Sequence, residues 1–235
     1  MNTIKISVRN LVEFILRSGD LTTSSGLKDP DAMQEGARIH KKIQRKMKSG
    51  YQAEVTLSLT VPVNYDDIDF EICVDGRADG IFTDETGYNI DEIKGVYREL
   101  ASLENPVEVH RAQALCYGYI WVATHQLDGI GIQMTYCHIP TEEIKRFNEY
   151  IDFKTLKKWF YDLLHEYAKW AAWEIKWHKK RNLSIKNVEF PFKYRPGQNT
   201  LVKGVYQTIL RKKKLYIEAP TGVGKTISTI FPAVR

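Results

Sequence analysis

The sequence has few cysteines and no long apolar run. Its 235 residues include three cysteines, Cys73, Cys116 and Cys137, which are far apart and show no Cys-x-x-Cys spacing. They cannot all pair, and each lies among apolar neighbours, so we expect buried, reduced thiols. No apolar run approaches membrane-spanning length, and the first residues lack the apolar stretch of a secretory signal. These absences exclude a fully disulfide-bonded framework and predict a cytoplasmic protein with no membrane partner.

The excess of positive charge is small. The formal net charge is +5, and hydrophobic and charged residues make up 43% and 27% of the chain, which is ordinary for a globular protein. A chain of this length can hold one good core and an appendage, or two small domains. The basic residues gather in runs at residues 41–48, 176–181 and 211–214. Such runs suit a polyanionic partner, and a solvated helix face is the alternative interpretation.

Residues 76–95 predict a β-hairpin that carries two acids and a lysine. Two alternating segments flank a polar turn at residues 84–87, whose glycine tolerates a positive φ. Side chains alternate across a strand, so Glu92 and Lys94 share one face, and Asp79 lies on the neighbouring strand. Converging carboxylates repel each other and are costly to bury unpaired, so a divalent cation is their natural occupant. The alternative is a solvated edge hairpin with a Glu–Lys pair.

Apolar periodicity predicts an α/β chain around this hairpin. Helical spacing predicts helices over residues 4–18, capped by Ser7, then over 31–49, 107–123 and, with a break near Asp152, 141–180. Strict alternation predicts strands over residues 52–63 and 130–139. The last helix carries an aromatic stripe, for most of which we expect core packing in preference to base stacking. The residues of the stripe are Trp159, Phe160, Tyr167, Trp170, Trp173 and Trp177.

An ordered set of polar residues resembles the PD-(D/E)XK nuclease superfamily, in its RecB-like branch. In chain order, the matching residues are Gly36 and His40 (G-x-x-x-H), Asp79, Glu92-Ile93-Lys94 (E-x-K), and Gln113 and Tyr117 (Q-x-x-x-Y). Each element alone is a weak signal: a lone histidine on a helix is usually a surface or core residue, and the helix over 107–123 could simply bury one glutamine. Their joint occurrence in this order favours the nuclease.

The resemblance implies a fold, a site and a reaction. The fold would be a mixed central sheet flanked by helices, and the reaction would be metal-dependent cleavage of DNA. Asp79, Glu92 and Lys94 would be catalytic, and Gln113 and Tyr117 would position the substrate. Mg²⁺ or Mn²⁺ would be held by His40, Asp79, Glu92 and the carbonyl of Ile93, and an imidazole ligand favours Mn²⁺. The basic residues of 41–48 would lie near the mouth of the site, where a nucleic-acid backbone arrives.

The C-terminal residues carry a second signal, a phosphate-binding loop. After a helix that ends near Leu210, residues 215–218 predict a short strand and residues 219–226 a loop that opens another helix. The loop resembles that of superfamily-two helicases, although Ala219 replaces the first glycine of the generic motif. The resemblance implies that ATP would be bound by Gln198, which would read the adenine, and by Gly222, Gly224, Lys225 and Thr226.

Together, the two signals resemble DinG/XPD-type helicases that carry an N-terminal nuclease. We expect a nuclease domain over residues 1–186 and the first part of a helicase ATPase domain over residues 187–235. No second acidic ATPase motif follows in this sequence, so we expect no ATP turnover by the chain alone. The leading hypothesis is a nuclease that acts in DNA processing on single strands or single-stranded ends. The alternatives are an inactive nuclease-like module that grips DNA for a helicase, and an ATPase segment with an accessory domain.

Overall fold

The structure, a computed structural model, describes residues 2–17, 30–47 and 49–234, without the side chains of residues 30–33. Ser18, the expected end of the first helix, and Lys48 of the first basic run lie outside this part. The chain forms two compact units, residues 1–172 and 173–235, and the division falls within helix α4 (Phe153–Lys186). In the described ranges, no helix combines the length and apolarity needed to cross a bilayer.

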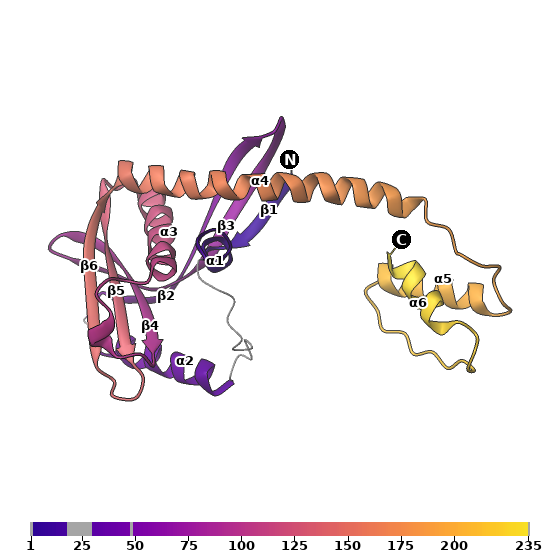
Figure 1. Cartoon of the computed structure of the whole chain (residues 1–235), viewed down its shortest axis with the longest axis horizontal. Helices are drawn as coiled ribbons and strands as arrows, with labels where there is room; N and C mark the ends of the chain where they lie inside the picture. Colours follow the sequence, from indigo (N-terminus) through magenta and orange to yellow (C-terminus); the bar gives the residue numbers. More distant parts are fainter. Residues whose placement is uncertain (1, 18–29, 48, 235) are drawn as a thin grey trace. The chain divides into compact units, whose positions relative to one another are not determined.

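A mixed sheet forms the centre of the first unit (Figure 1). Its strands are β1 (Asn2–Ser7), β2 (Gln52–Tyr65), β3 (Ile68–Asp84), β4 (Gly87–Val96), β5 (Gly129–His138) and β6 (Ile144–Asp152). The order β1-β3-β4-β5-β6 combines parallel pairs, β1 with β3 and β4 with β5, with antiparallel ones. This arrangement confirms the predicted fold class, a mixed central sheet, and the predicted hairpin and strands over 52–63 and 130–139.

Strand β3 pairs with three other strands, and this pairing determines where the sheet opens. It pairs with β2 along most of its 17 residues. On its other edge, residues 70–75 pair with β1 and residues 80–84 pair with β4. Residues 76–79 therefore lie between two neighbours on that edge, and the ladder between β3 and β4 stops at the pair of Gly80 and Asp91.

Helices flank the sheet on both faces. Helix α3 (Glu108–His125) packs against β4 and β5, and α1 (Val8–Leu16) packs against α3. Helix α2 (Pro30–Arg45) packs against β4 through Ile39 and Ile43, which form a buried cluster with Ile93. Side chains alternate along β4, so Glu92 and Lys94 point to the opposite face, toward α3. The predicted helices over 31–49 and 107–123 are confirmed, although α2 ends at Arg45, before Gly50.

Two predicted helical segments are strands instead. Residues 2–7 form β1, and the helix begins only at Val8, where Ser7 caps it by accepting a hydrogen bond from the amide of Asn10 at 3.2 Å. Residues 144–152 form β6, because alternate side chains are partly buried there and the edge of β5 is available for pairing. The predicted break at Asp152 is the true start of the next helix, since its carboxylate caps the amide of Thr155 at 2.9 Å.

The aromatic stripe on α4 divides by burial. Phe160 and Tyr167 are buried, as predicted for core packing, and Trp159 is half-buried. Core packing is wrong for the other three tryptophans, which are exposed: Trp170, Trp173 and Trp177.

The cysteines are free, as predicted. Cys116 and Cys137 are buried, whereas Cys73 is half-buried, so the prediction of buried thiols fails there. Burial raises the pKa of the Cys116 thiol, which keeps it protonated at neutral pH.

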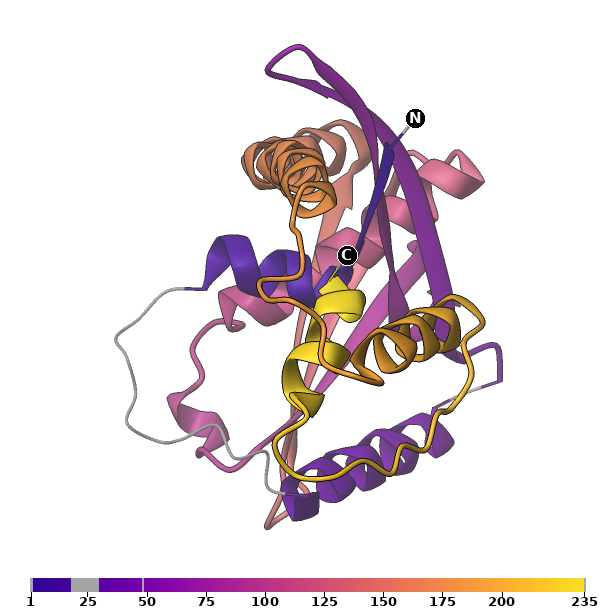
Figure 2. The same cartoon turned by 90° about the vertical axis from the view of Figure 1, so that its right-hand side faces the viewer.

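The second unit contains α5 (Gln198–Leu210) and α6 (Lys225–Val234), which lie side by side (Figure 2). The helix that ends at Leu210 and the helix opened by the loop are both confirmed. The predicted strand over residues 215–218 is wrong, because that segment has no regular structure and Tyr216 is 89% exposed. A strand needs a neighbour for its backbone hydrogen bonds, and the described residues of this unit provide none.

Candidate functional site

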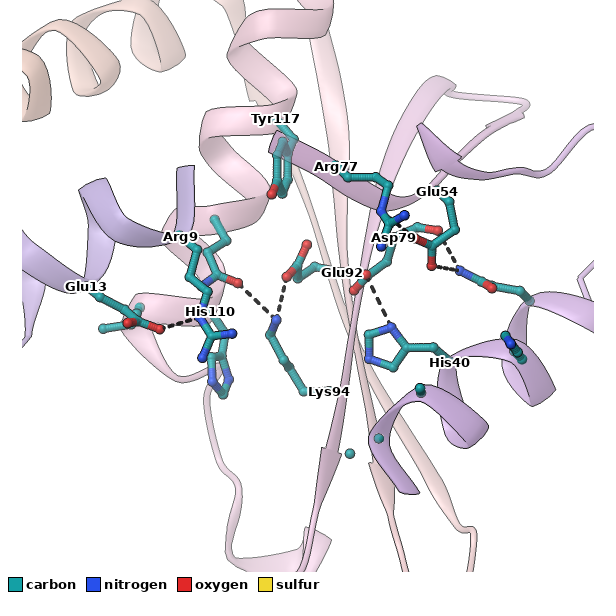
Figure 3. A pocket seen from close by; sticks show the side chains of 17 residues that line it. Arg9, Glu13, His40, Glu54, Arg77, Asp79, Glu92, Lys94, His110 and Tyr117 are labelled. Atoms are coloured by element: carbon teal, nitrogen blue, oxygen red, sulfur yellow. Dashed lines mark hydrogen bonds and ion pairs between the residues drawn. The ribbon is translucent and has the colours of Figure 1, made fainter. Parts of the chain in front are cut away.

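A cavity of about 920 Å³ opens where β3 and β4 separate (Figure 3). Its walls come from α1, α2, β2, β3, β4 and α3, with lining residues from Arg9 to Tyr117. The cavity is lined by seven residues of the nuclease-like motifs: Gly36, His40, Asp79, Glu92, Lys94, Gln113 and Tyr117. The sequence motifs therefore converge in space, and they do so at the point where the β3–β4 ladder ends.

Asp79 joins the two strands beyond the end of the ladder. Its Oδ2 accepts a hydrogen bond from the amide of Ile93 at 2.8 Å, so the carboxylate replaces a backbone acceptor. Its Oδ1 lies 3.2 Å from Nδ1 of His40, which reaches the site from α2. Burial lowers the pKa of His40, but the hydrogen bond and charge of Asp79 outweigh it and leave that pKa raised. The backbone contact of Ile93 here is its amide; its carbonyl as a ligand stays a prediction.

Glu92 and Lys94 form a buried ion pair beside Asp79. The Nζ of Lys94 lies 2.6 Å from Oε1 of Glu92, and the Glu92 side chain is only 4% exposed. Its other oxygen, Oε2, is buried and has no hydrogen-bond partner among the described residues. Burial raises the pKa of Glu92 to about 7, against the lowering effect of Lys94. An unpartnered oxygen in such a place is costly, and a cation would satisfy it.

Helix α3 contributes the second wall of the cavity. Oε1 of Gln113 accepts a hydrogen bond from Lys94 Nζ at 2.9 Å. One turn later, Tyr117 lies against Gly76, where an added Cβ would stand 2.8 Å from the tyrosine Oη. Burial raises the pKa of Tyr117, so its hydroxyl stays protonated at neutral pH. Gln113 and Tyr117 thus lie on the helix face that meets the E-x-K strand.

Several charged residues of the cavity lie outside the sequence motifs. Glu54 on β2 pairs with Arg77 on β3, with Oε2 and Nε 2.7 Å apart, and Arg9 on α1 also lines the cavity. The ligand atoms of Glu54, His40 and Asp79 lie within 4.8 Å of one another, and among the described residues these three form the compact group of possible metal ligands. The alternation of residues 52–63 indicated only that Glu54 lies on the polar face of its strand. Which residue stands opposite it depends on strand register, which that pattern does not reveal.

The predicted nucleotide-binding residues gather in the second unit. Gln198 contacts the loop, since its Nε2 donates to the carbonyl of Val223 at 3.2 Å. Gly222 and Gly224 both have positive φ, 85° and 76°, which glycine adopts at little cost. Lys225 begins α6 and its Nζ donates to the carbonyl of Ala219 at 2.9 Å, while Thr226 is exposed. The segment therefore forms a turn followed by a helix, and its binding of a nucleotide stays a prediction.

Comparisons with known proteins give partial likenesses. No family model matches the sequence. A probable ATP-dependent helicase of Methanocaldococcus jannaschii, MJ0942, is 43% identical over 47 residues, which is 20% of this chain and 7% of the helicase.

Two solved structures resemble the fold. The structure of SSO0001 matches with a TM-score of 0.40 and 19% identity, over 68% of this chain and 75% of its own. An alkaline exonuclease from Laribacter hongkongensis matches with a TM-score of 0.41 and 14% identity, over 77% of this chain and 94% of its own.

Proposed function

We propose that this chain is a divalent-metal-dependent deoxyribonuclease of the PD-(D/E)XK type that hydrolyses phosphodiester bonds. The observation that carries the proposal is the convergence of Asp79, Glu92 and Lys94 on one cavity, with Glu92 Oε2 buried and unpartnered. Sequence motifs that lie far apart along the chain would rarely meet in this way by chance. The nuclease has the RecB-like order of motifs, with His40 ahead of the hairpin and Gln113 behind it.

The donors of the cavity fit a hard or borderline divalent cation. His40, Asp79 and Glu92, together with the Ile93 carbonyl, would hold Mg²⁺ or Mn²⁺, because carboxylate oxygens suit both and imidazole favours Mn²⁺. The unpartnered oxygen of Glu92 is the observation that supports the fit. A bound cation of this kind polarises a phosphate oxygen and makes water a better nucleophile at neutral pH.

The side chains of the chain itself would orient the substrate and balance its charge. The ammonium group of Lys94 is largely buried, and it would stabilise the negative charge that builds up on the phosphoryl group. Gln113 holds that ammonium group at 2.9 Å, so the charge is already in position before the substrate arrives. Arg9, Lys41 and Arg77 line the same cavity and would meet the phosphates of a DNA strand, and Tyr117 would contact the substrate from α3.

The C-terminal residues would be the beginning of a helicase ATPase domain. We place the boundary between the nuclease domain, 1–186, and this segment, 187–235, and we assign the phosphates of ATP to the loop before α6. The contact of Gln198 with Val223 supports this. In a longer DinG/XPD-type protein or a complex, the nuclease would act on single-stranded DNA or single-stranded ends during repair or processing. The chain alone would not turn over ATP.

One assay tests the nuclease proposal. The chain is incubated with end-labelled single-stranded and double-stranded DNA in Mn²⁺, Mg²⁺ or chelator, and products are resolved on a denaturing gel. We expect cleavage that needs the cation and that falls at least a hundredfold in Asp79→Asn and Lys94→Ala. The exposed pair Lys158 and Asp162 on α4, 2.6 Å apart, offers matched controls, and Asp162→Asn and Lys158→Ala should cleave normally.

Unchanged cleavage in both Asp79→Asn and Lys94→Ala would overturn the proposal. Binding of DNA and cation without any cleavage would favour the inactive DNA-gripping module. Turnover of ATP by the chain would make the loop before α6 the functional centre.

A further inference from the structure

The C-terminal part of α4, which belongs to the second unit, exposes two tryptophans with parallel rings. Trp173 and Trp177 are 59% and 46% exposed. Their ring centroids are 6.1 Å apart, and the planes of the two rings differ by only 4°. Residues four positions apart lie on one side of a helix, so the two indoles form one continuous apolar surface, the tryptophan face. A continuous apolar surface in water marks an interaction site more strongly than a single exposed side chain does.

Positive charge borders the tryptophan face. Residues 173–186 contain five lysines and arginines and one acid. Lys180 follows the first tryptophan by seven positions and Arg181 follows the second by four, so both lie on the same side of α4 as the indoles, and both are exposed. The acid, Glu174, has its Oε1 3.7 Å from Nε2 of His178. The surroundings of the two indoles are therefore strongly basic.

Parallel indoles next to basic side chains match the chemistry of single-stranded nucleic acid. Unpaired bases stack on exposed aromatic rings, and lysines and arginines neutralise the neighbouring phosphates. A duplex matches this surface less well, because its bases are already stacked on one another and only its phosphates are accessible. A protein partner also matches less well, since charged residues are depleted at the centre of protein interfaces.

We propose that the tryptophan face binds single-stranded DNA, with bases stacked on Trp173 and Trp177 and phosphates held by Lys180 and Arg181. This inference rests on the proposed function in one respect, since it takes DNA as the partner. It deepens that function by naming a place where the strand is held other than the cavity. The residues that line the cavity belong to the first unit, whereas the tryptophan face belongs to the second.

Fluorescence anisotropy of a labelled oligothymidylate tests the role of the indoles. An oligomer of about 15 nucleotides is within the usual range of site sizes, and it is titrated with the whole chain in chelator, so that no divalent cation is needed. We expect Trp173→Ala and Trp177→Ala each to weaken binding about tenfold. Trp177→Phe should lose less than about threefold, because it keeps an aromatic ring. Phe192→Ala, a control at an aromatic that is 71% exposed outside α4, should bind like the parent protein.

Two further comparisons separate stacking from charge. An oligomer of the same length that carries abasic sugars keeps its phosphates and offers no base, so the parent protein should bind it about tenfold more weakly. Lys180→Gln should weaken binding several-fold. Lys179→Gln is the matched control, because this exposed lysine is next in sequence but lies on the other side of the helix, and it should bind within about twofold of the parent protein. Thermal unfolding verifies that each variant is folded.

The outcomes separate this inference from the nuclease proposal. Parent-like affinity in both Trp173→Ala and Trp177→Ala, or equal affinity for the abasic oligomer, overturns it. A changed oligomeric state of these variants in light scattering, with unchanged affinity for DNA, overturns it in favour of a contact between copies of the chain. Failure of the parent protein to bind the oligothymidylate in chelator also overturns it, while the nuclease proposal is decided by cleavage. Weakened binding in both variants supports the inference even when no DNA is cleaved, and then only the nuclease proposal fails.

Discussion

The ammonium group of Lys94 lies 2.9 Å from the side-chain oxygen of Gln113, so a residue of the E-x-K strand is held in place by the helix that follows it. This contact connects the E-x-K motif with the Q-x-x-x-Y motif, which are the last two motifs of the nuclease-like region in chain order. Gln113 is buried, and its oxygen is one of two acceptors around an ammonium group that is itself largely shielded from water. The position of the Lys94 charge therefore depends on α3.

Replacing Gln113 by leucine should impair catalysis and spare cation binding. Lys94 would lose one acceptor and move toward Glu92, away from the place where it faces the substrate. We expect a loss of about tenfold to a hundredfold in kcat, the usual range for residues that orient a reacting group. Single-turnover DNA cleavage and Mn²⁺ titration measure the two effects separately. Gln207→Ala, at an exposed position of α5, is the control. Equal loss of Mn²⁺ affinity would contradict a positioning role.

Replacing Glu54 by asparagine should stabilise the cation-free protein. Asparagine accepts the left-handed conformation that Glu54 adopts at φ 58°, and it removes the repulsion from Asp79. The lost pair with Arg77 is exposed and offsets only part of this gain. We expect about 1 kcal/mol of added stability in chelator, measured by urea denaturation. A less stable variant in chelator would contradict the account of strain.

Gly36 in the cavity wall and Gly76, which lies against Tyr117, should respond in opposite ways to alanine. At Gly76 an added Cβ would meet the Tyr117 ring, with the Oη at 2.8 Å, so Gly76→Ala should destabilise the protein by about 1–3 kcal/mol. At Gly36 the same Cβ has nothing within 4 Å, and the residue is inside α2, so Gly36→Ala should stabilise by about 0.5–1 kcal/mol. Urea denaturation of both variants checks this, and similar effects of the two would argue against the close approach of Tyr117.

His110 should make the protein less stable in mild acid. Burial lowers its pKa to about 4, and Lys94, Arg9 and Arg98 add to the effect while Glu13 opposes it. Between the ordinary pKa near 6.5 and about 4, the unfolded chain takes up a proton at this residue and the folded chain does not. Stability from this source is therefore present above pH 6.5 and is lost as the pH falls toward 4.

The variant His110→Asn isolates this contribution, because an asparagine nitrogen or oxygen can take the place of Nδ1 near Tyr136 Oη. Between pH 7.5 and pH 5, the parent protein in chelator should lose about 1–2 kcal/mol more than the variant. Denaturant titrations at the two pH values measure the difference. His40, whose pKa is raised, is common to both proteins and cancels in the comparison. Equal losses in the two proteins would show that His110 is not the source.

Several elements could be predicted because their signal is local. The turn at 84–87 and the alternation on each side are enough for the hairpin of β3 and β4, and a helical apolar pattern is enough for α3. The shared face of Glu92 and Lys94 follows from strand periodicity alone. By contrast, residues 2–7 and 144–152 become strands because the edges of β3 and β5 are there to pair with, and no local pattern reports an available edge.

By itself, the sequence determined the order of the polar motifs and the face of each element on which they lie. Only the tertiary structure decided which of those faces meet, and it brought the side chain of Glu54 close to His40 and Asp79, with Arg77 beside it. The physical reason is that side-chain periodicity within a helix or strand follows from backbone geometry, which is the same for every residue of the element. The register between two strands, such as β2 and β3, depends on the packing of the whole sheet.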